Sequence, residues 1–181
     1  MQEFRVNDYI TLRLEGKDTV IYVAGERFRQ CKYLLISIPV EDISTFDGID
    51  SIDETAENLD KSLENIRTPP NIPIEVQFWA HCSNLQVWSE NEYDTRLLHS
   101  NIAFPLLKKL TEVGDKQALK VFKEEIAKRM ESGYEPVIKF LWNEGYIRYL
   151  GSEELTSLTN SISDDLRSLS ELEHLLKKRI F

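Results

Sequence analysis

One stretch, residues 73–150, most constrains the fold of this chain, because its apolar residues recur at helical spacing between residues that begin and end helices. Pro73 suits a first helical position, where its missing N–H costs nothing. The first helix then carries an apolar stripe made of Ile74, Phe78, His81, Leu85 and Trp88, flanked by Cys82. Residues 91–93 interrupt this pattern, so we expect the helix to end there.

Three further helices are predicted between residues 94 and 145. Asp94 is a suitable cap for the second helix, and Pro105 inside its pattern predicts a kink or a fresh start. Gly114 ends this helix and Asp115 caps the third, which runs to Gly133. A fourth helix opens at Pro136 and ends at Gly145, and the stripes of these helices comprise Leu98, Ile102, Leu106, Leu110, Val113, Leu119, Phe122, Ile126, Met130, Val137, Ile138, Leu141 and Trp142. Short antiparallel helices of this kind indicate either HEAT- or armadillo-like hairpins or a compact bundle.

Residues 9–38 have the pattern of an antiparallel sheet. Ile10, Leu12 and Leu14 alternate with more polar residues, which is the period of a half-buried strand. Residues 16–17 and 24–26 offer turns, residues 19–23 and 33–38 are strand-like, and Phe28 lies in a short segment between them. Three or four strands cannot stand alone, so we expect the sheet to share one core with the helices.

The segment 40–64 is acidic, with nine Asp or Glu residues against one Lys, a net charge of −8. Ser51 and Glu54 form a capping box, and the apolar residues that follow predict a surface helix: Ile52, Ala56, Leu59, Leu63 and Ile66. The proline-containing residues 67–72 are the best boundary. We therefore predict an α+β fold, in which a sheet and acidic helix (1–67) pack on a larger helical bundle (73–150), followed by a C-terminal helix (151–181).

The C-terminal part is predicted to hold a short helix at residues 153–158 and a longer amphipathic one. The apolar seam of the longer helix consists of Ile162, Leu166, Leu169, Leu172, Leu176 and Ile180. Lys177, Lys178 and Arg179 lie favourably at its C-terminal end. A seam of this kind must be covered, either by the bundle of the same chain or by another chain.

The net charge of −9, from 31 acidic and 22 basic residues, disfavours generic binding to nucleic acid or to anionic membranes. No apolar run approaches the length of roughly 18 residues that a transmembrane helix needs. The N-terminal residues lack the layout of a signal peptide, and the two cysteines imply no disulfide framework. We expect a cytoplasmic protein with reduced thiols.

Three sequence segments resemble a known group of proteins: FWAHCSNLQVW (78–88), YDTRLLHSNIAFPLLKKLTEVGD (93–115) and KVFKEEIAKRMESGY (120–134). They resemble the N-terminal region of archaeal proteins labelled leucine-rich-repeat proteins, over about residues 4–150. The resemblance implies an archaeal cytoplasmic protein and carries no activity. The chain departs from the pattern after Leu150, where it has no repeated L-x-x-L-x-L units.

His81, Cys82 and His99 form the sharpest chemical cluster in the sequence. With Cys31 as a fourth ligand they have the residue types of a zinc site, but neither C-x-x-C nor H-x-x-x-H spacing is present. Cys82 and His99 are also candidates for a nucleophile and its base, with Asp94 orienting the imidazole. The simpler interpretation is that Cys82 and His81 lie in the core, that His99 lies on a helix surface and that Asp94 is a cap. This interpretation predicts no metal or cofactor.

Two other groups of residues have the composition of binding sites. The loop residues Glu90, Asn91, Glu92 and Asp94 offer oxygen ligands for a hard cation but lack the glycine and the register of an EF-hand. Basic residues of 108–129 are interleaved with glutamates, which is typical of a salt-bridged, solvated surface rather than a phosphate-binding track. Trp79 lies nine residues before Trp88, nearly half a turn out of phase, which favours its exposure. An exposed tryptophan would mark an interface, while partial burial is the commoner fate of this residue.

The sequence thus favours a non-catalytic protein–protein interaction module. Its partner would be another protein or a second copy, bound through the C-terminal helix, with interface residues Trp79, Leu166, Leu169, Leu172 and Leu176. The alternative is an enzyme or metal-binding protein centred on His81, Cys82 and His99.

Overall fold

The computed structural model describes residues 2–29, 51, 54, 72–132 and 134–161. The predicted strand at 33–38, most of the acidic helix, Cys31 and the helix from Ile162 onward therefore lie outside the described residues. The chain divides into two compact units, Met1–Val121 and Phe122–Phe181, and each is described by itself.

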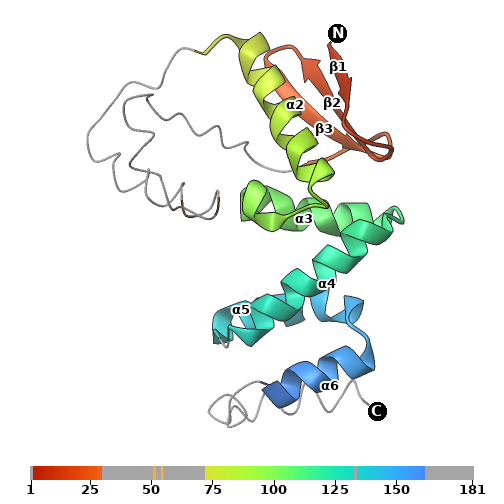
Figure 1. Ribbon diagram of the computed structural model, residues 1–181, viewed down its shortest axis with the longest axis vertical. Helices are drawn as coiled ribbons and strands as arrows, with labels where there is room; N and C mark the ends of the chain where they lie inside the picture. The colour runs from red at the N-terminus through yellow and green to blue at the C-terminus, as the bar shows by residue number, and fades with distance from the viewer. Residues whose placement is uncertain (1, 30–50, 52–53, 55–71, 133, 162–181) are drawn as a thin grey trace, which may run out of the picture. The chain divides into compact units, whose positions relative to one another are not determined.

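Unit one begins with a four-stranded antiparallel sheet in the order β1-β2-β3-β4 (Figure 1). The strands are β1 (Glu3–Arg5), β2 (Ile10–Glu15), β3 (Asp18–Val23) and β4 (Glu26–Arg27). Ile10 and Leu12 are fully buried, as their alternation predicts. The pattern did not predict β1, which has one apolar residue in three and is defined by its pairing with β2.

The first helix, α2 (Ile74–Glu90), lies beside this sheet (Figure 1). Pro73 is its N-cap, one residue before the predicted position. The side chains that α2 buries follow the predicted stripe: Phe78, His81, Cys82, Leu85 and Trp88. Contacts such as the Phe4–Trp79 ring pair join the sheet and α2.

The next elements are the 3-10 turn η2 (Thr95–Leu97) and α3 (Ser100–Glu112). The sequence predicted Asp94 as the cap of this helix, but Asp94 caps η2, and His99 caps α3 by accepting the Asn101 N–H on Nδ1 at 3.2 Å. Of the kink or fresh start predicted at Pro105, the fresh start does not occur, because α3 runs through this residue. A proline here removes one hydrogen bond to the carbonyl four residues earlier, and the burial of the apolar residues on either side compensates.

α4 (Lys116–Glu131) spans the division between the units. Gly114, with a φ of +95°, ends α3, and Asp115 caps α4, both as predicted.

Unit two continues with α5 (Glu135–Asn143), the 3-10 turn η3 (Tyr146–Tyr149) and α6 (Ser152–Ser161). Its buried side chains are Phe122, Ile126, Met130, Ile138, Leu141, Tyr146, Ile147, Leu150, Leu155 and Leu158.

A sheet followed by helices makes the fold α+β, which confirms the predicted class. Helical hairpins of the HEAT or armadillo kind stay a prediction.

Candidate functional site

The most unusual surface among the described residues is one side of α2. Val76, Trp79 and Val87 are 54%, 51% and 44% exposed, although the opposite side of the same helix is packed in the core. Their spacing places them on one face together with the exposed Ser83. We call these four residues the α2 outer face. Clustered large apolar side chains in water are typical of binding surfaces, whereas scattered ones need no explanation.

Trp79 is held in a defined position on this face. Its ring lies edge-on to the rings of Phe4, with centroids 5.9 Å apart, and of Phe78, at 5.3 Å. One contact comes from β1 and the other from the preceding residue of α2. A half-exposed ring that is already fixed loses little side-chain entropy when another surface covers it. The predicted exposure of Trp79 agrees with the structure, and its role in an interface stays a prediction.

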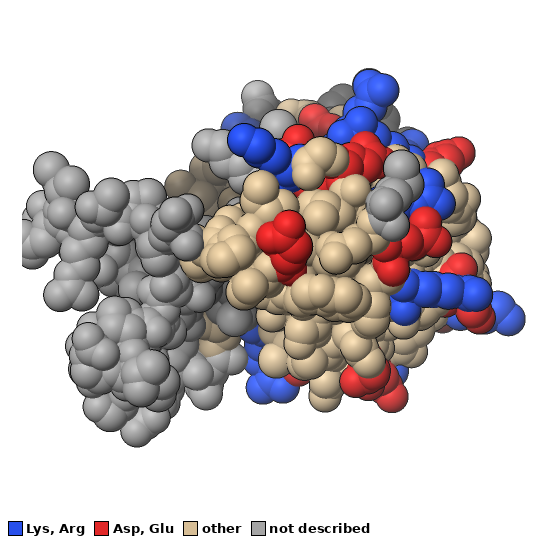
Figure 2. Space-filling view, turned by 90° about the horizontal axis from the view of Figure 1, so that it is seen from above, with Lys and Arg blue, Asp and Glu red and all other residues tan. Residues whose placement is uncertain are grey.

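The charged side chains of α2 itself are all acidic. α2 contains no Lys or Arg, and the exposed Glu75 and Glu90 lie at its two ends. Neither carboxylate forms an ion pair with any residue in the described part of the chain, and Glu90 accepts only the Gln86 amide, at 2.8 Å. Figure 2 shows the described surface from above, with acidic and basic side chains interspersed among uncharged ones.

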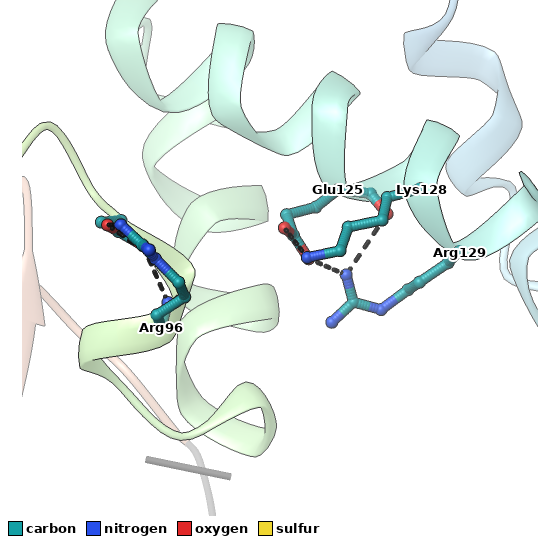
Figure 3. A network of polar contacts seen from close by, with 5 residues as sticks. Arg96, Glu125, Lys128 and Arg129 are labelled. Atoms are coloured by element: carbon teal, nitrogen blue, oxygen red, sulfur yellow. Dashed lines mark hydrogen bonds and ion pairs between the residues drawn. The ribbon is translucent and has the colours of Figure 1, made fainter. Parts of the chain in front are cut away.

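Basic residues elsewhere bind carboxylates. Lys109 Nζ lies 2.7 Å from Glu26, and Lys123 Nζ lies 3.0 Å from Glu154. Figure 3 shows Glu125 of α4 paired with Arg129 and Lys128, its neighbours on the next turn. Arg96, in the same view, pairs with Asp94 at 2.6 Å. These contacts agree with the predicted salt-bridged surface.

His81 and Cys82 both point into the core, where they are 8% and 1% exposed. Burial raises the pKa of the Cys82 thiol to about 11, so the thiol stays protonated at neutral pH. A protonated, buried thiol is a poor nucleophile and a poor metal ligand. Burial likewise lowers the pKa of His81 to about 4 and keeps its imidazole neutral.

The other candidates are engaged as caps. His99 Nδ1 accepts the Asn101 N–H, and Asp94 accepts both the backbone N–H and the guanidinium of Arg96. Among the residues that the structure describes, no three His, Cys, Asp or Glu side chains gather closely enough to hold a metal ion. Cys31, the fourth proposed ligand, lies outside the described residues.

The stability of the protein should fall between pH 6.5 and pH 4 because of His81. Its pKa is 6.5 in the unfolded chain and about 4 in the folded one, so the unfolded state binds more protons in this window. The contribution of the neutral His81 imidazole to the free energy of unfolding is complete above pH 6.5 and is lost as the pH falls from 6.5 toward 4. Urea unfolding against pH should show a shallower slope in His81→Gln. A His81 ring that titrates near 6.5 in the folded protein by NMR would contradict this expectation.

A buried polar network, which local patterns did not predict, joins three segments of unit one. Tyr93 donates its hydroxyl to Asp115 Oδ2 at 2.6 Å, and Asn7 Nδ2 donates to the Tyr93 hydroxyl at 3.0 Å and to Ser89 Oγ at 2.8 Å. Burial, and then the Asp115 carboxylate, raise the pKa of Tyr93. Tyr93 has a φ of +65°, a left-handed conformation that costs a non-glycine residue energy and that this network helps to maintain. We interpret it as structural.

No helix within the described ranges combines the length and apolarity needed to cross a bilayer. Comparison with known proteins adds no identity, because no protein family, curated protein or solved structure matches this chain.

Proposed function

We propose that this chain is a non-catalytic protein–protein interaction module. The observation that carries the proposal is the α2 outer face, where a fixed, half-exposed Trp79 lies between Val76 and Val87. Tryptophan is among the residues that contribute most to binding free energy at protein interfaces. Two apolar neighbours on the same helix extend the surface along α2, which is the arrangement that an amphipathic partner segment needs.

The second part of the proposal is the partner, either another protein or a second copy of this chain. The leucine seam predicted at Leu166, Leu169, Leu172 and Leu176 lies outside the described residues and remains a proposed contact. We also propose a cytoplasmic location, an archaeal origin and a relationship to archaeal leucine-rich-repeat proteins, all on the basis of the sequence. The burial of His81 and Cys82 removes support from the alternative of a catalytic or metal centre.

The proposal predicts that Trp79 is open to solvent in the dilute, full-length protein. Acrylamide should quench part of the tryptophan emission, and this quenchable part should fall in Trp79→Phe to what the half-buried Trp142 contributes. Trp88→Phe is the matched control, because Trp88 has no exposed surface and should contribute little quenchable emission. If the emission lost in Trp79→Phe is already protected from acrylamide at high dilution, the chain itself covers this face and the proposal is wrong.

A further inference from the structure

The α2 outer face sets three requirements for what binds it. The occupant must present apolar side chains at helical spacing, because Val76, Ser83 and Val87 follow one line along the helix. It must span a helix of 17 residues, which is about 25 Å long. It must also carry positive charge near one end, since Glu75 and Glu90 lack ion-pair partners in the described part of the chain and α2 has no basic residue.

The chain's own sequence contains one segment that meets all three requirements. Residues 162–181 continue directly from α6 and provide 20 residues, with the apolar seam from Ile162 to Ile180. Lys177, Lys178 and Arg179 near its end are the only run of three basic residues in the sequence. The acidic segment 40–64, with its net charge of −8, is a poorer electrostatic match for a face bordered by glutamates.

We propose that the α2 outer face binds residues 162–181 of a second copy of this chain. This inference rests on the proposed interaction function and names the partner. Exchange of the same segment between two copies forms the contact twice and closes a twofold dimer, whereas two α2 outer faces placed directly together would oppose their glutamates. The apolar seam supplies the buried surface, and the basic run supplies a partner for the glutamate at one end of α2.

Sedimentation of the full-length protein over a range of concentrations tests this dimer. We expect a monomer–dimer equilibrium whose dissociation constant rises about tenfold or more in Val76→Ser/Val87→Ser, since both side chains are exposed in the monomer and central to the contact. Phe140→Ser is the matched apolar control. Phe140 is 50% exposed on α5, away from this face in sequence, and its replacement should leave the dimer unchanged.

Charge reversal separates this contact from a general loss of structure. Glu75→Lys/Glu90→Lys should weaken the dimer, and so should Lys177→Glu/Lys178→Glu, while the four changes together should restore part of the affinity. Glu144→Lys, at an exposed glutamate of unit two, is the charge control and should have no effect. Rescue by the combined variant requires that the two sets of charges meet, so its failure overturns the proposal.

Two other outcomes also overturn it. A full-length protein that is monomeric at every concentration excludes the exchanged dimer. A dimer that the α2 variants leave unchanged places the contact elsewhere. Either result can occur while Trp79 is open to acrylamide, in which case the interaction function stands with a different partner and only the second-copy assignment fails.

Discussion

Replacing Phe122 by alanine is expected to lower the free energy of unfolding by about 3–5 kcal/mol, the usual cost of deleting a buried aromatic side chain. The Phe122 side chain has no exposed surface. Its ring lies edge-on to Tyr149, with centroids 5.1 Å apart, and to Tyr146 at 6.0 Å. The substitution therefore leaves a cavity between α4 and η3 in unit two and removes two aromatic contacts.

Phe140→Ala makes the same chemical change at an exposed site and serves as the control. Phe140 is 50% exposed, and its ring contacts Tyr146 with centroids 5.6 Å apart, so we expect a loss of at most about 1 kcal/mol. Urea unfolding monitored by circular dichroism measures both variants. Equal losses would show that Phe122 does not lie in a packed core.

Asp115→Ala is expected to destabilise the protein by about 2–4 kcal/mol, from two separate effects of one carboxylate. Asp115 Oδ1 caps α4 by accepting the N–H groups of Gln117 and Ala118 at 2.9 and 3.0 Å. The loss of such a cap typically costs about 0.5–2 kcal/mol. Oδ2 accepts the buried Tyr93 hydroxyl, and a buried hydroxyl without its partner costs about 1–3 kcal/mol.

The second effect can be isolated with Tyr93→Phe. In Asp115→Ala/Tyr93→Phe no hydroxyl is left without its acceptor, so the double variant should lose less stability than the two single variants added together. Asp8→Ala is the control, because Asp8 is 89% exposed and its ion pair with Arg5 contributes little. Strictly additive losses in urea unfolding would show that Tyr93 and Asp115 are not coupled.

Part of the candidate site could be predicted from sequence. The nine-residue separation of Trp79 and Trp88 places them on different sides of a helix, and one is half exposed while the other is fully buried. The predicted stripe also leaves Val76 and Val87 off the buried face, and the structure exposes both. Periodicity alone could not predict whether another part of the chain packs on that second apolar side of α2.

The reactivity of the candidate cluster at His81 and Cys82 could not be predicted from the sequence. His81 and Cys82 are adjacent in the sequence, and their residue types alone are compatible with catalysis or metal binding. Their burial, which perturbs both pKa values toward the neutral form, depends on the sheet and helices packed around them. Reactivity is a property of the surroundings, so a local pattern could not decide it.

Features that depend on near neighbours in the chain could be predicted from the amino-acid sequence. The ends of α3 and α5 at Gly114 and Gly145, the cap at Asp115 and the alternation in β2 all follow from backbone sterics, hydrogen bonding over one turn or a fixed residue period. Tertiary structure alone decided the bonds of Asn7 to Ser89 and Tyr93, more than eighty residues away, and the pairing of β1. Such partners become neighbours only when the apolar faces of the sheet and α2 are buried together, since the free energy of that burial, and no local preference, brings them into contact.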